Sequence, residues 1–592
     1  MKNAIIITQA KDLSVCPSGE MVVYFCTNES SYRVCLEKGL ECELLDEQSI
    51  SSEYIAINDW AYQSTMALLD RFKDRPDKHS RLDAAFIDVK AVFVETLKIS
   101  KILNSLKKRH ACNKLYIPAS NRDTFFGTAM QILFGNNQEA QILFFYGSEK
   151  ENYCGPPNFK QSARSILLAL LKKRAVRKLI RCEREERKFV FASGSLKHLE
   201  HVITQLRQDG CQVMYCESEF NLEKLIFCLK KGVLFYPISK GDPKNSPFTE
   251  KDILFDEKDL VYDNKDYSQI FQNIFLAVLR VGLLRNPYDG ISVDRNFSSP
   301  ALQCVLLDED FSCRRLFYVH ARKLKKPCFV ISHGVPALFL GNKSAIKGQY
   351  TSSVTFVQSD FEKSAYESIY LNPSRILVTG LPRYDRLVNQ PKKKASGNPA
   401  KKTILYCGSI FYEYDFRSFF TVLGCKEFLG DFTKRYLFDL LDFCAKRPEV
   451  ILDIKPHYNE EGEWMRVIQA YGSSAKWRLR SHRDDIISLA NGSDVLVTPE
   501  SSVISEAIML GKPVVVLNYG TQNLSTPCFE RDGVIWHARN KEDLHQGLIK
   551  SLEDGGYLAE MERNRKDTFS FYAGAFDGLN RYRVTEAIHG GA

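Results

Sequence analysis

The chain has 592 residues, enough for roughly two to four domains, and its hydrophobic content of 44% and charged content of 26% are ordinary for a soluble globular protein. The net charge of +9 is mild for this length, and no aromatic-rich basic groove or known binding motif accompanies it, which argues against a nucleic-acid-binding protein. The first apolar run is too short for a secretory signal, and no run approaches the roughly 18 residues of a membrane span. We therefore expect a chain that is cytoplasmic or held from outside the bilayer at the inner face of the membrane.

Short apolar runs alternate with helical segments over the first two thirds of the chain, a pattern typical of parallel sheets covered by helices. The expected helices are Asp59–Lys73, Val89–Leu106, Ser268–Leu284 and Ser312–Lys323. The expected strands are Ala4–Thr8, Met21–Cys26, Glu43–Leu45, Lys114–Ile117, Gln141–Tyr146, Lys188–Ala192, Gln212–Cys216, Gly232–Tyr236, Leu302–Leu307, Cys328–Ile331, Thr355–Gln358 and Ile376–Thr379. We assign residues 1–387 to one Rossmann-like, acceptor-side region with a helical insertion near 50–185. Whether the first 300 residues form one domain or two stays open.

One segment of this region is strongly basic. Arg164–Lys188 contains ten Lys and Arg residues against three Glu, with apolar residues near helical spacing. A basic amphipathic helix of this kind can lie on an anionic membrane. The alternative is an ordinary solvated helix that joins two parts of the domain.

Residues 388–402 are rich in Pro, Lys, Gly and Ser, which indicates an interdomain linker. A second α/β series follows in residues 403–575, and residues 576–592 are expected to form a C-terminal helix. The strands expected in this series are Thr403–Cys407, Val450–Ile454, Val495–Thr498 and Val514–Leu517, and the helices are Phe432–Ala445, Glu460–Tyr471, Asp484–Leu489, Val503–Leu510 and Lys541–Leu552. The fold class is therefore α/β, with two Rossmann-like domains that face a central cleft, where ligands of such sheets bind.

The segment Asp494–Gly520 reads as strand, turn, helix, turn and strand, with Glu500-Ser501-Ser502 in the first turn. The free N–H groups and the dipole of a helix N-terminus bind phosphate, and the two hydroxyls add donors. The alternative is a plain helix cap, which any βα unit uses.

Four other buried strands run directly into polar residues. Val450–Ile454 leads to Lys455-Pro456-His457, where a cation neutralises a departing phosphate. Cys328–Ile331 leads to His333 and Gly334, and Gly permits a close backbone approach. The remaining two strands lead to Asp308-Glu309-Asp310, a candidate base for an acceptor hydroxyl, and to Gly380, Arg383 and Asp385. The alternatives are a lone surface histidine for His457, local loop hydrogen bonds for His333, a solvated turn with a helix N-cap for the acids, and an Arg383–Asp385 pair at the hinge.

Taken together, the ordered elements SHGVP, VTGLPRYD, IKPH and PESSVISEAIMLGKPVVVL resemble the GT-B transferases that build bacterial surface polymers from CDP- or CMP-activated donors. These include the CDP-glycerol glycerophosphotransferases and the CMP-Kdo and CMP-sialic acid transferases. The match covers about Leu302 to Ile588. The segment from Thr498 to Val516 also looks like the UDP-N-acetylglucosamine 2-epimerases.

The resemblance implies a transferase that moves a sugar or glycerophosphate from a nucleotide-activated donor, CMP or CDP rather than UDP, to a glycan or lipid-linked acceptor of a capsule, O-antigen or teichoic-acid-like polymer. It implies neither a cofactor nor a metal. The residues expected in catalysis are Asp308, Glu309, His333 and His457, and those expected to bind the donor are Gly334, Gly380, Arg383, Lys455, Glu500, Ser501, Ser502 and Glu506. Two alternatives stay open: a nucleotide-sugar epimerase or hydrolase, and a non-catalytic, degenerate GT-B protein.

Overall fold

The structure of the chain is a computed structural model. It describes three parallel sheets and the helices that cover them, but not every connection. The described residues are 3–7, 22–26, 35, 38–44, 54–75, parts of 89–97, 114–118, 141–145, 159–185, 187–217, 222–237, 260–280, 299–308, 314–332, 354–367, 375–388, 401–408, 426–456, 461–499, 501–517, 519, 530 and 532–591.

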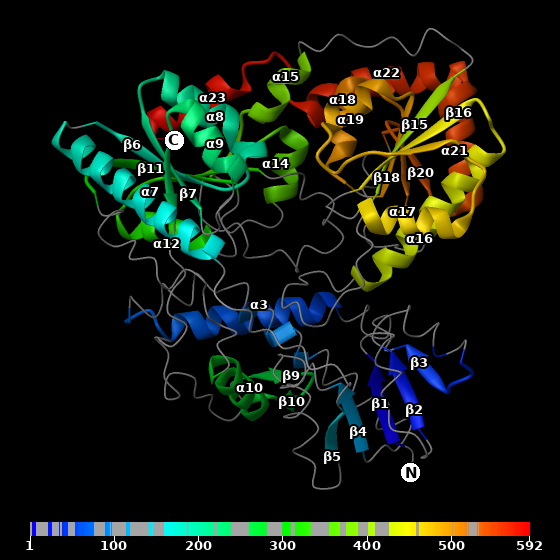
Figure 1. Cartoon of the computed structure of the whole chain (residues 1–592), viewed down its shortest axis with the longest axis horizontal. Coiled ribbons are helices and arrows are strands. Elements are labelled where there is room, and N and C mark those ends of the chain that lie inside the picture. Colours follow the sequence, from blue (N-terminus) through cyan, green and yellow to red (C-terminus); the bar gives the residue numbers. More distant parts are fainter. Residues whose placement is uncertain are drawn as a thin grey trace.

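The N-terminal part of the chain forms a five-stranded parallel sheet in the order β3-β2-β1-β4-β5. Helix α3 (Tyr54–Asp70) lies between this sheet and the rest of the molecule in Figure 1. A short antiparallel pair, β9 and β10, and helix α10 (Ser268–Arg280) lie beside α3. The strands are β1 (Asn3–Ile7), β2 (Val22–Cys26), β3 (Cys42–Leu44), β4 (Lys114–Pro118), β5 (Gln141–Phe145), β9 (Val261–Tyr262) and β10 (Lys265–Asp266).

A seven-stranded parallel sheet, in the order β14-β13-β12-β11-β6-β7-β8, forms the first Rossmann-like domain. It stands at the upper left of Figure 1. Its strands are β6 (Phe189–Ser193), β7 (Gln212–Glu217), β8 (Leu234–Pro237), β11 (Leu302–Leu307), β12 (Cys328–Ile331), β13 (Val354–Val357) and β14 (Ile376–Val378). Its helices are α7 (Phe159–Arg184), α8 (Leu196–Gln208), α9 (Leu222–Lys231), α12 (Arg315–Lys323), α14 (Asp360–Glu367), η7 (Pro382–Tyr384) and α15 (Asp385–Val388).

A six-stranded parallel sheet, in the order β17-β16-β15-β18-β19-β20, forms the second domain at the upper right of Figure 1. Its strands are β15 (Lys402–Cys407), β16 (Val450–Lys455), β17 (Trp477–Leu479), β18 (Val495–Pro499), β19 (Val514–Leu517) and β20 (Trp536–Ala538). Its helices are α16 (Lys426–Ala445), α17 (Glu461–Tyr471), α18 (Ile486–Gly492), α19 (Val503–Leu510), α21 (Lys541–Glu553) and α22 (Gly555–Ala573).

The last helix, α23 (Asn580–Gly590), returns to the first domain and packs against α8 (Figure 1). One continuous core therefore runs through both domains: it joins Leu199 of α8 and Tyr384 of η7 to Ile504 of α19 and Val584 of α23. The central strands are buried on both faces, as in β18 and β19, which explains their uninterrupted apolar sequences.

The predicted α/β class with two Rossmann-like domains is confirmed. The region predicted as one unit, 1–387, contains two separate sheets. The predicted insertion near 50–185 contains α3 and α7 but also β4 and β5. Most of the predicted linker, 389–400, lies outside the described residues. Within the part of the chain that the structure describes, no helix is both long and apolar enough to span a bilayer.

Candidate functional site

The carboxyl edge of the six-stranded sheet carries half-buried polar groups. Strands β15, β16 and β18 are neighbours, so the residues that follow them meet at one edge. Lys455 ends β16, and Ser501 and Ser502 precede α19. The Ser502 hydroxyl makes no capping hydrogen bond, and the Ser501 hydroxyl accepts only a long one, 3.4 Å, from the Val503 N–H. A plain helix cap therefore explains neither hydroxyl well.

Lys455 is held in place by its own domain. Its ammonium donates to the carbonyl oxygen of His482 at 2.9 Å, and the His482 ring lies 2.6 Å from the Glu461 carboxylate at the start of α17. Burial raises the pKa of the Cys407 thiol, at the end of β15, to about 12, and the charges of Lys455 and Glu506 act on it in opposite directions. Lys455 and Glu506 therefore both lie close enough to the end of β15 for their charges to act there.

The carboxyl edge of the seven-stranded sheet is arranged differently, because its acids are buried. Asp308 follows β11 with no exposed side-chain surface. Its carboxylate accepts from the Ser195 N–H at 2.7 Å and lies 2.9 Å from an Arg314 nitrogen. The backbone at Gly194 is at φ +150°, and a Cβ there would lie 2.4 Å from the Asp308 carboxylate, so only glycine fits. Asp308 thus fixes the turn between β6 and α8.

A second buried acid, Glu362 of α14, bonds to Ser332, the residue that directly follows β12. Its carboxylate accepts from the Ser332 hydroxyl and from the Gln358 N–H, and the Tyr366 hydroxyl lies 3.2 Å from that of Ser332. Burial raises the pKa of Glu362 to about 7, although these two donors and the charge of Arg383 oppose the shift. The residue directly after Ser332 is the predicted catalytic His333.

Arg383 lies deeper than the sequence suggests. Its guanidinium stacks on the Tyr384 ring at 4.6 Å and donates to His198 of α8 at 2.9 Å. Burial opposes its charge, but Tyr384, Glu506 and Glu362 outweigh that effect and raise its pKa. Arg383 is therefore a buried cation between two acids, one from each domain.

Gly380 and Asp385 attach the C-terminal helix to the first domain. Gly380 has φ +75°, and a Cβ there would lie 2.1 Å from the Asn580 side chain. The Asp385 carboxylate accepts from the Asn580 and Arg581 N–H groups at 2.9 and 3.0 Å, which caps α23. The Arg383–Asp385 pair, the alternative to a ligand-binding Arg383, does not form, since Asp385 bonds to α23 and Arg383 bonds to His198.

Lys197, near the carboxyl end of β6, is a charged residue that the sequence patterns did not single out. Lys197 lies in the first turn of α8 and keeps contact with solvent. The surrounding protein lowers its pKa, Glu506 opposes that shift, and the cations Arg383, Lys455 and Arg386 add to it. Charges of both domains therefore act on Lys197, and we refer to Lys197, Arg383, Lys455 and Glu506 as the cationic cluster. The signal in the sequence was the turn Gly194-Ser195, which follows the buried strand β6 in the same way as the turns that were singled out.

Of the predicted site residues, Arg383, Lys455 and Glu506 lie close enough to Lys197 for their charges to act on it. Ser501 and Ser502 lie at the same sheet edge as Lys455, whereas Asp308 and Gly380 have the structural contacts given above. The predicted residues that lie outside the described ones are Glu309, His333, Gly334, His457 and Glu500. Among the described residues, no group of three His, Cys, Asp or Glu side chains is arranged to hold a metal ion.

The fold is α/β and GT-B-like, with two Rossmann-like domains in addition to the N-terminal five-stranded sheet. Residues 314–589 match the model of the CDP-Glycerol:Poly(glycerophosphate) glycerophosphotransferase family, which confirms the resemblance drawn from the sequence. No curated protein matches the sequence significantly.

Solved structures of two kinds are similar to the chain at low identity. A putative UDP-N-acetylglucosamine 2-epimerase from Listeria monocytogenes has 15% identity over 68% of this chain and 96% of its own, with a TM-score of 0.43. The UDP-GlcNAc 2-epimerase from Neisseria meningitidis has 17% identity over 68% of this chain and 100% of its own, with a TM-score of 0.42. The wall teichoic acid polymerase TagF has 13% identity over 72% of this chain and 97% of its own, with a TM-score of 0.39.

Proposed function

We propose that this protein transfers glycerophosphate from CDP-glycerol to the end of a glycerophosphate-type surface polymer. The observation that carries the proposal is the cationic cluster between the two sheet edges, in a chain whose residues 314–589 match a glycerophosphotransferase family. CDP-glycerol is a diphosphate diester with two negative charges. The positive charges of Lys197, Arg383 and Lys455 are complementary to them. Glu506 keeps the cluster from excess positive charge while it is empty.

In this reaction an acceptor hydroxyl attacks the β-phosphorus of CDP-glycerol. A new phosphorus–oxygen bond forms to the acceptor, the bond from the β-phosphorus to the bridging oxygen breaks, and CMP leaves with the bridging oxygen. The acceptor proton passes to a general base. Negative charge grows on the leaving phosphate, so fixed cations beside that oxygen stabilise the transition state more than the ground state.

We assign each residue a role according to the domain on which it lies. Lys455, Ser501, Ser502 and the N-terminus of α19 hold the nucleotide phosphates, with His457 beside the leaving group. Lys197 reaches the same phosphates from the first domain. His333, the residue next in the chain to Ser332, takes the acceptor proton, and Glu309 assists it. Asp308 is better suited to fixing the Gly194 turn than to acting as a base, because it is fully buried and its carboxylate is engaged by Ser195 and Arg314.

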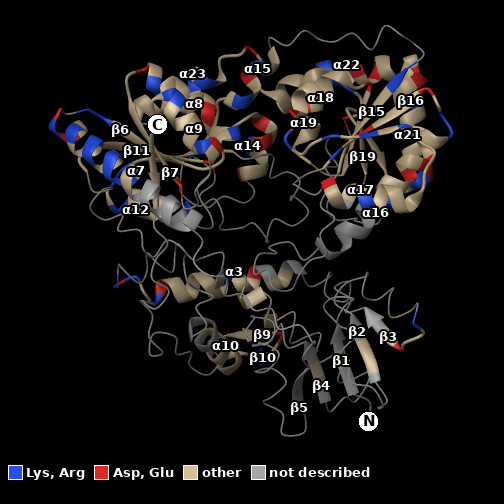
Figure 2. Ribbon diagram, in the orientation of Figure 1, with Lys and Arg blue, Asp and Glu red and all other residues tan. Residues whose placement is uncertain are grey.

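The acceptor belongs to the proposal as well. A growing surface polymer is attached to a lipid at the inner face of the membrane, so the enzyme works beside that membrane as a peripheral protein. The basic segment Arg164–Lys188 forms most of α7 and its adjoining residues, and Figure 2 shows its Lys and Arg residues along that helix. It is our candidate for the contact.

The test is nucleotide binding and turnover by the purified full-length chain. We expect CDP-glycerol and CDP to raise the melting temperature, and CMP release from CDP-glycerol to require a glycerophosphate acceptor and to persist in EDTA. Lys197→Ala and Lys455→Ala should each weaken CDP binding roughly tenfold, since a charge-assisted hydrogen bond contributes about 1.5–3 kcal/mol.

Lys363→Ala is the matched control, because Lys363 lies on α14 with 39% of its side chain exposed and pairs only with Glu367 among the contacts described for it. It should bind CDP like the wild type. The proposal is wrong if no cytidine nucleotide binds, or if both cleft variants bind as the control does. Product formed from a UDP-sugar without any acceptor would instead indicate an epimerase or hydrolase.

A further inference from the structure

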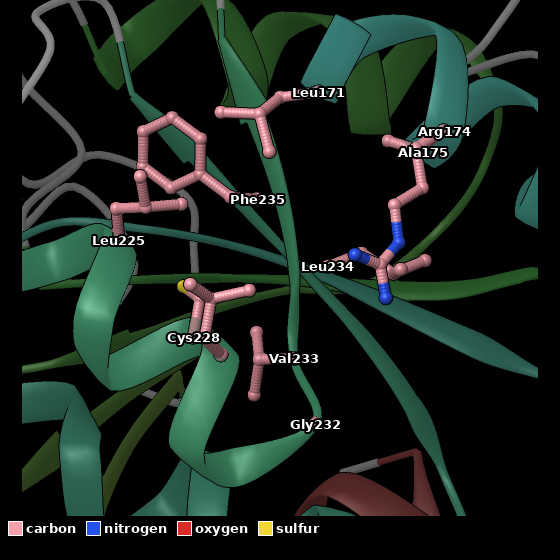
Figure 3. A pocket seen from close by; sticks show the side chains of 10 residues that line it. Leu171, Arg174, Ala175, Leu225, Cys228, Gly232, Val233, Leu234 and Phe235 are labelled. Carbon is pink, nitrogen blue, oxygen red and sulfur yellow. The ribbon is translucent and has the colours of Figure 1, made fainter. Parts of the chain in front are cut away.

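The described part of the chain contains two cavities of different character. The smaller, of about 80 Å³, lies between α7, α9 and the edge strand β8, and Arg174 is the only charged residue among the described ones that line it (Figure 3). The larger, of about 380 Å³, lies in the six-stranded domain and has several charged residues in its lining. Sites for small ligands usually have volumes of about 300–1,000 Å³, so the larger cavity has the size of a ligand site.

The larger cavity opens at the amino edge of the six-stranded sheet. Lys402 begins β15, Asp494 directly precedes β18 and Pro513 directly precedes β19, and all three line the cavity. These strands are parallel neighbours, so their first residues lie at one edge. The proposed donor site, with Ser501 and Ser502, follows the last residues of the strands and lies at the opposite edge. The cavity is therefore separate from the proposed donor site.

Cations outnumber acids around this cavity. The charged residues that line it are Lys402, Lys512, Arg565, Asp494 and Glu562. Both acids are already engaged within the protein: the Asp494 carboxylate accepts from the Thr403 N–H at 2.7 Å, and the Glu562 carboxylate pairs with Arg565. The charge of the lining is thus complementary to a ligand with one negative charge, such as a carboxylate.

Two hydrogen-bond donors at the cavity have no acceptor among the described residues. One is the hydroxyl of Ser551, a residue that is 3% exposed. The other is the Nε–H of Arg565, whose side chain is 11% exposed. A buried donor without an acceptor destabilises the folded state, so such groups are usually satisfied by protein, water or an ion. The oxygens of a bound anion would supply the missing acceptors.

Helix α19 connects the cavity to the proposed donor site. Leu510 and Gly511, at its C-terminal end, line the cavity, and Ser502 directly precedes its first residue. The Arg565 guanidinium donates to the Ile508 carbonyl oxygen of α19 at 3.1 Å. A ligand that contacts Arg565 therefore acts on the group that holds the C-terminal end of this helix.

We propose that this cavity binds a small organic anion with an apolar body, and that the bound ligand regulates the donor site through α19. The anionic group of the ligand accepts from Arg565, Ser551 and Lys402. Its apolar body packs against Leu558 and Met561 of α22, which belong to the apolar part of the lining. The regulation rests on the proposed function, whereas binding of the anion is measurable without any donor.

The experiment is ligand-observed NMR on the full-length chain with naphthoate and its neutral analogue naphthamide. We expect naphthoate to bind with a Kd of about 0.1–1 mM, as is ordinary for a ligand of this size. Naphthamide should bind roughly tenfold more weakly, because it lacks the charge. Lys402→Gln and Ser551→Ala should each weaken naphthoate binding roughly fivefold. Leu558→Trp, which fills the cavity, should weaken it roughly tenfold or more.

The matched controls are Arg563→Gln and Ser570→Ala, since both residues are exposed on α22 and neither lines the cavity. Both should bind naphthoate like the wild type. Ser551→Ala should not lower the melting temperature, because it removes a hydroxyl that makes no hydrogen bond. Lys455→Ala checks the location: Lys455 ends β16 at the carboxyl edge, so this variant should bind naphthoate like the wild type.

The regulation is measured by titrating CDP with and without saturating naphthoate. Naphthoate should weaken CDP binding roughly threefold, and CDP should weaken naphthoate binding by the same factor, because coupling between two sites is reciprocal. The inference is wrong if naphthamide binds as well as naphthoate, if the cavity variants bind like their controls, or if Lys455→Ala abolishes naphthoate binding. Unchanged CDP affinity would refute the regulation. If the wild type binds naphthoate in the cavity but binds no cytidine nucleotide, the proposed function fails and the anion site stands.

Discussion

In both Rossmann-like domains, polar residues follow the buried strands, but these residues have different roles in the two domains. In the seven-stranded domain, the acids after the strands are buried and bonded within the protein: Asp308 to the Ser195 turn, Glu362 to Ser332, and Asp385 to α23. In the six-stranded domain, Ser501 and Ser502 remain half-buried and weakly bonded. The acids of the first domain thus have structural roles, whereas the serine hydroxyls of the second domain remain available to a ligand. Substitutions of the buried acids of the first domain should cost stability, and substitutions of Ser501 and Ser502 in the second should cost donor affinity.

The largest effect on the free energy of unfolding is expected from substitution of Arg383. Arg383→Ala removes a buried cation that faces Glu362 and Glu506 and leaves both carboxylates uncompensated. We expect a loss of about 3–5 kcal/mol in the free energy of unfolding, measured by urea denaturation. Arg386→Ala, which breaks an exposed pair with Asp485, should cost about 1 kcal/mol or less. Equal losses in both variants would contradict a buried, charge-balancing role for Arg383.

Glu362 should make stability depend on pH. Its pKa of about 7 in the folded chain is above the ordinary 4.5, so the folded state binds this proton more tightly than the unfolded state does. The stabilisation is complete below pH 4.5 and is lost as pH rises through 7, a fall of about 3 kcal/mol. Glu362→Gln should abolish this part of the fall. Unfolding free energies from about pH 5 to about pH 8.5 check it, and parallel profiles for the variant and the wild type would refute it.

Gly380 tests the attachment of the C-terminal helix. Gly380→Ala places a Cβ against Asn580 in a left-handed backbone conformation and should cost about 2–3 kcal/mol. Gly472→Ala is the control, because Gly472 has φ +68° but no heavy atom within 4 Å of the place that a Cβ would take, and it should cost about 1–2 kcal/mol. Only the Gly380 variant should speed proteolysis near the C-terminus. If the two variants are cut at the same rate, Gly380 does not hold α23.

The smallest effect on stability is expected at Ser502. Since its hydroxyl makes no capping bond, Ser502→Ala should change the unfolding free energy by about 0.5 kcal/mol or less. It should nevertheless weaken CDP binding roughly fivefold, as one hydrogen bond of about 1 kcal/mol is lost. Calorimetry with CDP measures the second effect. A stability loss without an affinity loss would make Ser502 an ordinary cap and would remove the contrast between the domains.

The sequence by itself determined the central strands, because a strand buried on both faces must be an uninterrupted apolar run. Val495–Thr498 and Val514–Leu517 were predicted almost to the residue for that reason. The edge strands β17 and β20 were missed, since three-residue strands at the sheet margin need no such run. Helix α22 was missed too: few of its residues are buried, so its sequence has no clear apolar face.

The sequence also located the turns that carry chemistry, because a polar residue directly after a buried strand must lie at the carboxyl edge of a sheet. Only the tertiary structure decided what each residue faces. In the structure Arg383 bonds to His198 and Asp308 pairs with Arg314. The charge of Glu506 acts on both Arg383 and Lys197. Most of these partners lie more than about a hundred positions apart in the chain, and local pattern carries no information on contacts at such separations, which depend on how whole sheets and helices pack.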